Sequence, residues 1–147
     1  MLGVCVVGVP ALLAQGPAFS PLQPDLFAAG QNLVNAVADV DRDGDLDLFV
    51  GFDGAPNRLY RNDGGRFADV APAAGVADAR PTRAAAFGDM DADGDADLVV
   101  GFAPAPNTSV LRLYRNDGGR FADATAAAGL AVSGGAVRQP AWVDVDA

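Results

Sequence analysis

The chain has 147 residues, a formal net charge of −9 at pH 7 and an aromatic content of only 7%. All nineteen acidic residues are aspartate, all ten basic residues are arginine, and there is no histidine. An acidic chain lacks the basic surface that nucleic-acid binding requires. Because general acid–base catalysis would fall to Asp or Tyr alone, we also predict that the protein is not an enzyme.

The first segment, Met1 to Ala14, is an apolar run that is too short to span a bilayer. Together with Gly16-Pro17-Ala18 it predicts a signal peptide over residues 1–18, whose cleavage removes the only cysteine, Cys5. The alternative is an apolar strand of a preceding repeat. Residues 19–32 are then a linker or part of a preceding blade. We therefore predict a secreted protein, or one in the periplasm or at the cell surface, without a transmembrane segment.

An acidic string of nine residues comes next and occurs twice, from Asp39 to Asp47 and from Asp89 to Asp97. Carboxylates this close repel one another unless a cation or water neutralises them. Aspartate at positions one, three, five and nine, glycine at position six and a carbonyl at position seven form an all-oxygen loop that suits Ca²⁺. Position seven, Asp45 or Asp95, is expected to bind through its carbonyl and to leave its carboxylate in water. The predicted calcium-binding residues are Asp39, Asp41, Asp43, Asp45 and Asp47 in the first loop, and Asp89, Asp91, Asp93, Asp95 and Asp97 in the second.

Three other interpretations of these strings fit less well. A solvated acidic turn does not explain why the string recurs in the same context. Zinc or copper would require His or Cys ligands. An EF-hand needs glutamate at position twelve, where this chain has Val50 and Val100. The residues that follow, 47–52 and 97–102, are rich in β-branched and aromatic side chains, so each loop joins two strands.

The repetition extends well beyond the loops. Leu59 to Asp69 reappears without a change as Leu113 to Asp123, and the offset grows from fifty to fifty-four residues because Thr108 to Leu111 is inserted. Repeated units of four short antiparallel strands predict an all-β fold built from β-propeller blades. The alternative, a β-sandwich, does not predict identical strings in register. The strands expected in the first unit are roughly 33–40, 47–52, 58–61 and 66–70, and the second unit repeats them.

Particular residues within the repeated strands carry further expectations. Gly51 and Gly101 are expected to permit close approach of neighbouring strands. Arg61 and Arg115 recur with Asn62 and Asn116 in the identical string, where they form either a repeated ligand surface or structural hydrogen bonds at the hairpin. We favour the structural role.

The repeats also divide the chain. We expect blade one over residues 33–83, blade two over 84–137, and the start of a third unit over 138–147. In that third unit Trp142 to Ala147 aligns with Phe87 to Ala92, and the sequence stops before the loop is complete. This pattern predicts an incomplete propeller, either a truncated gene product or an assembly fragment. Open blades leave a sheet face and edge strands uncovered, which favours self-association.

The segment Phe87 to Gly101 and its partner, Ala38 to Gly51, resemble the FG-GAP/VCBS repeats of integrin-α-type β-propellers. The identical string Leu-Tyr-Arg-Asn-Asp-Gly-Gly-Arg-Phe-Ala-Asp is similar to the UnbV-like bacterial group related to cartilage acidic protein. The resemblance covers about residue 33 to the C-terminus. It implies an extracellular setting and a structural calcium ion in each blade hairpin, at the ten aspartates named above.

We therefore predict a secreted calcium-binding repeat module without catalytic activity, which acts as an interaction or adhesion scaffold for an extracellular protein or carbohydrate. One alternative is a lectin-like propeller, for which Tyr60, Tyr114 and Trp142 are the candidate aromatic side chains. The two tyrosines lie mid-strand, where packing is the more usual role. Another alternative is the accessory propeller of a larger secreted enzyme.

Overall fold

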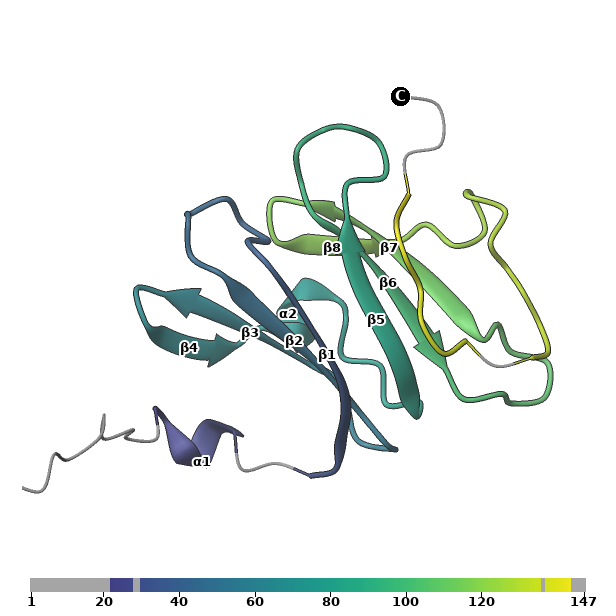
Figure 1. Cartoon of the computed structure of the whole chain (residues 1–147), viewed down its shortest axis with the longest axis horizontal. Coiled ribbons are helices and arrows are strands. Elements are labelled where there is room, and N and C mark those ends of the chain that lie inside the picture. Colours follow the sequence, from purple (N-terminus) through teal and green to yellow (C-terminus); the bar gives the residue numbers. More distant parts are fainter. Residues whose placement is uncertain (1–21, 28–29, 136, 144–147) are drawn as a thin grey trace, which may run out of the picture.

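Two four-stranded antiparallel sheets make up the computed structural model of the chain, which describes residues 22–27, 30–135 and 137–143 (Figure 1). This arrangement confirms the predicted all-β class and is consistent with blades of a partial propeller. The predicted signal peptide and the last four residues of the third unit lie outside the described residues. The first sheet consists of β1 (Asn32–Ala38), β2 (Asp47–Phe52), β3 (Arg58–Asp63) and β4 (Arg66–Asp69). The second consists of β5 (Thr82–Gly88), β6 (Asp97–Phe102), β7 (Leu111–Asp117) and β8 (Arg120–Asp123).

In the first sheet, β1 and β3 each have one end that differs from the sequence prediction by two residues. β1 stops at Ala38 instead of residue 40, because the acidic loop already turns at Asp39. β3 runs on to Asp63, because the two glycines of the hairpin adopt positive φ angles of 62° and 85° and make a tight turn. The strand ladder therefore continues to the Asp63–Arg66 pair.

The two sheets share one apolar core. Phe49 and Leu59 of the first sheet are fully buried in it, as are Leu98 and Val100 of the second. The short helix α2 (Ala71–Ala74), which lies in the connection between the sheets, also contributes to this core (Figure 1). The two repeats are therefore packed against each other as one unit.

Glycine allows the two sheets to approach closely, as predicted. A Cβ atom on Gly51 would lie 2.5 Å from Thr82 Cγ2 on β5, a distance that no side chain tolerates. In the second sheet, a Cβ on Gly101 would lie 2.6 Å from Val137 Cγ1. Trp142 lies over Gly88 in the same way. The described part of the C-terminal segment therefore packs on β6 as β5 packs on β2.

The other face of the first sheet is covered in part by α1 (Pro24–Phe27). The Leu26 carbonyl accepts a hydrogen bond of 3.0 Å from the Tyr60 hydroxyl. The Phe27 ring lies 4.8 Å from the Tyr60 ring, centre to centre. Among the described residues, neither helix has the length and apolar character needed to cross a membrane.

Candidate metal centres

The two acidic strings form loops of the same shape. The first connects β1 to β2 and the second connects β5 to β6. Position four of each loop, Arg42 or Ala92, has a left-handed φ of 61° or 58°. Position six, Gly44 or Gly94, has a φ of 94° or 88°, which glycine adopts at little cost. Two independent stretches of backbone therefore follow the same path.

Main-chain amides of each loop donate to its own carboxylates. Gly44 donates to Asp39 at 2.9 Å, and in the second loop Gly94 donates to Asp89 at 3.0 Å. The carboxylate at position five accepts the N–H of position seven at 2.8 Å in both loops. These bonds fix the acidic side chains of positions one and five against the turn.

The structure brings together three of the five predicted residues in each loop. Positions one and three meet in both, but the third member differs between the loops: it is position five in the first and position nine in the second. Within each group the nearest carboxylate oxygens all lie within 4.8 Å of one another. The groups are Asp39, Asp41 and Asp43 in the first loop, and Asp89, Asp91 and Asp97 in the second.

Position nine is also a buried structural anchor. Asp47 is fully buried and accepts the main-chain N–H groups of Val40 and Asn62, both at 2.8 Å. Asp97 accepts two hydrogen bonds of 2.7 Å from the main-chain N–H groups at the equivalent positions of the second repeat. Burial raises the pKa of Asp47, although the two backbone hydrogen bonds oppose this effect. Each of these aspartates ties both ends of its loop to the following hairpin.

The expectation that position seven leaves its carboxylate in water is wrong for Asp95, which is only 3% exposed. Its carboxylate accepts the N–H of Gly118 at 3.1 Å, and Asp45 accepts the N–H of Gly64 at 2.7 Å. The reason is that each β-hairpin folds back over its loop and turns a glycine amide toward position seven. Local spacing gives no sign of this contact, because the partner lies about twenty residues further along the chain.

The chemistry of the two sites fits a hard cation. Asp41 Oδ1 is buried, and among the described residues it has no hydrogen-bond partner. The nearest positive charge in a salt bridge with this carboxylate is Arg61, whose Nε lies 3.8 Å from Oδ2. Loss of water and the charges of Asp93 and Asp97 raise the pKa of Asp91, which shows how crowded the second group is. Each group of three carboxylates has one arginine in a salt bridge, so most of its negative charge remains uncompensated. Such all-oxygen groups suit Ca²⁺.

The hairpin asparagines have the structural role that we favoured. The side-chain oxygen of Asn62 accepts the N–H of Gly65 at 2.8 Å, and that of Asn116 accepts the N–H of Gly119 at 2.9 Å. Asn116 also donates to the carbonyl of Val40, at 2.8 Å, in the first repeat. These side chains hold the hairpins against the loops.

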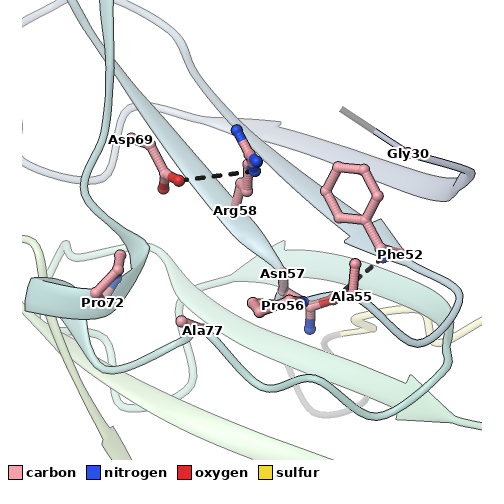
Figure 2. Close-up of a pocket in the computed structure, with 9 residues that line it drawn as sticks. All are labelled: Gly30, Phe52, Ala55, Pro56, Asn57, Arg58, Asp69, Pro72 and Ala77. Carbon is pink, nitrogen blue, oxygen red and sulfur yellow. Dashed lines mark hydrogen bonds and ion pairs between the residues drawn. The ribbon is translucent and has the colours of Figure 1, made fainter. Parts of the chain in front are cut away.

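Sequence reasoning missed a pair of cavities at equivalent places in the two repeats. The first, of about 300 Å³, lies beside Phe52, Asn57, and the facing side chains of Arg58 and Asp69 (Figure 2). The second, of about 440 Å³, has the matching pair Arg112 and Asp123, fifty-four residues later. The identical strings alone do not predict these cavities, because the cavity walls also include the segments between strands, whose sequences differ between the repeats.

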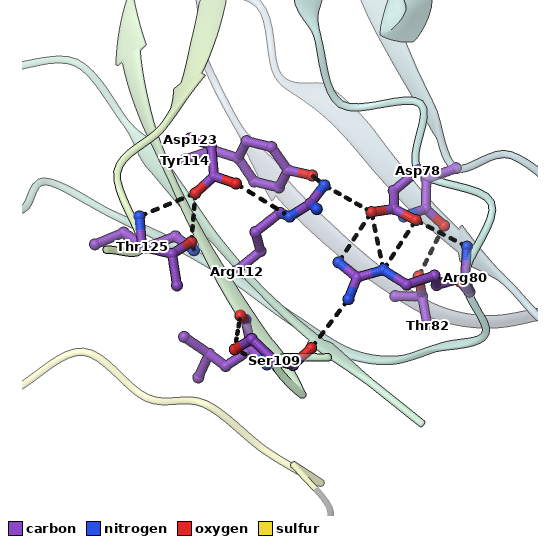
Figure 3. Close-up of polar contacts among 11 residues, drawn as sticks. Asp78, Arg80, Thr82, Ser109, Arg112, Tyr114, Asp123 and Thr125 are labelled. Carbon is purple, nitrogen blue, oxygen red and sulfur yellow. Dashed lines mark hydrogen bonds and ion pairs between the residues drawn. The ribbon is translucent and has the colours of Figure 1, made fainter. Parts of the chain in front are cut away.

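A polar network borders the second cavity (Figure 3). Asp78 accepts hydrogen bonds from the guanidinium of Arg80, at 3.0 to 3.2 Å, and from Arg112 at 2.8 Å. Burial alone would raise the pKa of Asp78, but the hydrogen bonds and charges of the two arginines outweigh it and lower that pKa. Arg80 also stacks on the Phe102 ring, 3.7 Å from its centre. The network joins the connection between the sheets to β7.

The aromatic residues considered for a lectin are mostly used in packing. Tyr60 and Tyr114 are only 2% and 3% exposed, so the packing interpretation is confirmed for both. Trp142 is 37% exposed and donates weakly, at 3.4 Å, to the Ala86 carbonyl. None of the three presents an open ring face to either cavity as a lining residue.

Part of the chain matches a known protein family. Residues 39–100 match the family model of the FG-GAP-like repeat. No curated protein matches the chain. The matched segment begins at the first residue of the first acidic loop and ends within β6, so it contains both candidate metal centres. This match supports the FG-GAP repeat family for the repeated unit of the chain.

Proposed function

We propose that this chain is a non-catalytic calcium-binding repeat module in which one ion stabilises each acidic loop. The observation that carries the proposal is the pair of carboxylate groups, each with oxygens within 4.8 Å of one another, on loops of matching backbone shape. A bound calcium ion would supply the positive charge that these carboxylates lack. The chain itself already fixes the loop through the buried carboxylates at position nine.

The proposed setting is extracellular, on the cell surface or in the periplasm. Calcium sites of modest affinity are filled where calcium is millimolar, which is the condition outside cells. In this setting the module would act as an interaction or adhesion scaffold. The absence of His, Lys and Glu from the sequence supports a role that does not depend on proton transfer.

The paired cavities favour a second candidate function, carbohydrate binding. Each cavity places a guanidinium beside a carboxylate, Arg58 with Asp69 or Arg112 with Asp123. Such a pair offers donors and acceptors together, which suits sugar hydroxyl groups. Titration with a panel of neutral sugars, followed by Arg112→Ala, tests this candidate.

Calcium titration of the chelator-stripped full chain tests the leading proposal. We expect about two ions to bind, and occupancy at 100 times the dissociation constant to add about 2.7 kcal/mol per site to the free energy of unfolding. Asp41→Asn and Asp91→Asn should each weaken one site. Asp117→Asn is the matched control, because Asp117 is exposed and outside both loops. A folded protein that binds no calcium would contradict the proposal.

A further inference from the structure

The two acidic loops touch each other across the boundary between repeats. They lie at the same end of the two sheets (Figure 1). Arg42, at position four of the first loop, places its Nε 2.6 Å from Asp95 Oδ1 at position seven of the second. The Asp95 side chain is 4% exposed, whereas that of Arg42 is 57% exposed. The contact is an ion pair and not an aligned hydrogen bond, because among the described residues Asp95 Oδ1 has no hydrogen-bond partner. The charge of an arginine in one candidate metal centre therefore offsets that of a buried carboxylate in the other.

Comparison of the two loops shows that this contact is particular to the boundary. Asp45 is the counterpart of Asp95, and among the described residues its only polar side-chain contact is with the Gly64 amide. It is also less buried than Asp95. Position four of the second loop is Ala92, which adopts the same left-handed conformation as Arg42. The loop shape therefore does not require arginine at this position. The guanidinium of Arg42 contacts the neighbouring loop instead.

Two further contacts join the same segments. Asn116 is fully buried and donates to the Val40 carbonyl at 2.8 Å and to the Ala96 carbonyl at 3.1 Å. A Cβ on Gly119 would lie 3.6 Å from the Cβ of Asp41, in ordinary contact. The first loop is therefore in contact with both the second loop and the hairpin that covers it.

We propose that Arg42 is a positioning residue that couples the two calcium sites, so that an ion in one raises the affinity of the other. This inference rests on the proposed function. Arg42 lies between two members of the first carboxylate group, Asp41 and Asp43, so their convergence on an ion fixes the backbone that carries the guanidinium. The guanidinium in turn fixes Asp95, the residue expected to offer its carbonyl to the second ion.

The sign of the coupling follows from the position of the contact. Ordering of either loop removes motion that the other would otherwise have to lose on binding, which gives positive cooperativity. By linkage, each ion must raise the affinity for the other by the same factor. We expect about fivefold, the lower end of the usual range of coupling between sites. If the guanidinium instead competed with calcium for the Asp95 region, removal of its charge would strengthen the second site.

The test is calcium calorimetry on full-length proteins with one loop silenced at a time. Asp41→Asn with Asp43→Asn silences the first loop, and Asp91→Asn with Asp93→Asn silences the second. In the wild-type background, silencing either loop should weaken the remaining site about fivefold. In the Arg42→Ala background the same silencing should change the remaining site little. Arg66→Ala is the matched control, because Arg66 is an exposed arginine of the first repeat outside the loops.

The outcomes separate this inference from the proposed function. If two ions bind and the affinity for each does not depend on the other, the coupling is overturned but the proposed calcium sites are not. Coupling that persists in Arg42→Ala overturns the role of Arg42, and so does tighter binding at the second site in that variant. A folded protein that binds no calcium overturns both. Thermal unfolding without calcium shows whether each variant is folded before it is titrated.

Discussion

Asp78 shows how one carboxylate can tie a connecting segment to a sheet. It lies between the two repeats, and its side chain is 11% exposed. It pairs with Arg80 in the connection and with Arg112 on β7. Both partners of such a partly buried, charge-assisted hydrogen bond matter for stability, because removal of one leaves the other partly desolvated and unpaired.

We predict that Asp78→Asn lowers the free energy of unfolding by about 1–3 kcal/mol at pH 7, because two partly buried arginine contacts are weakened. The folded-state pKa of Asp78 is depressed below its ordinary value of 3.8. Its contribution is therefore present above pH 3.8 and is lost as the pH falls through the lower, folded-state pKa. Denaturant unfolding from pH 7 down to acid measures this. The difference between wild type and Asp78→Asn should shrink at low pH, and a constant difference would contradict the prediction.

At the scale of elements, the hairpins and the loops depend on each other. The amide of the first glycine in each hairpin, Gly64 or Gly118, donates to the carboxylate at position seven. The side-chain amide of each hairpin asparagine donates to a carbonyl of the loop backbone. The two asparagines differ in one respect. Asn116 donates to the Val40 carbonyl in the other repeat, whereas within the described part of the chain the Asn62 amide donates only to the Leu46 carbonyl of its own repeat. The two hairpins can therefore be compared: that of Asn116 has a hydrogen bond to the other repeat, and that of Asn62 bonds its own repeat.

We predict that Asn116→Ala destabilises the protein more than Asn62→Ala. Asn116 is fully buried, so its loss leaves carbonyl groups without a donor, at a cost of about 1–3 kcal/mol. Asn62 is partly exposed, and water can replace its bonds. Chemical denaturation of both variants, without calcium, measures the difference. Equal costs would show that the bond across the boundary contributes nothing.

The sequence predicted the loops and most strands because their signals are local. Alternating aspartates, a glycine at position six and an Asn-Asp-Gly-Gly turn each act within a few residues. The roles of Asp95 and Arg42 were not predictable in this way. Their partners are the hairpin glycine at residue 118 and the neighbouring loop, which come close only after the strands pair and the sheets pack. The two cavities were not predictable for the same reason, because their lining residues come together only when the chain is folded.

At the scale of the whole molecule, the two sheets present the same row of side chains to different surroundings. In the second sheet the row is Phe87, Leu98 and Tyr114, paired across the strands and packed against the first repeat. In the first sheet the matching row is Val37, Leu48 and Tyr60. Helix α1 contacts the Tyr60 end of that row, whereas Val37 is 52% exposed. The first sheet therefore exposes apolar surface at the Val37 end of this row, whereas the matching row of the second sheet packs against the first repeat.

We predict that the Val37 end of this row supports weak self-association of the chain, because exposed apolar surface on a sheet favours contact with another copy. Val37→Asp should reduce the association, since a charge cannot be buried there without a partner. Val132→Asp is the matched control, because Val132 is 49% exposed and lies outside both sheets. Sedimentation velocity over a range of concentrations measures the effect. If wild type and Val37→Asp sediment alike at every concentration, this row is not the contact surface, and the exposed valine is ordinary surface.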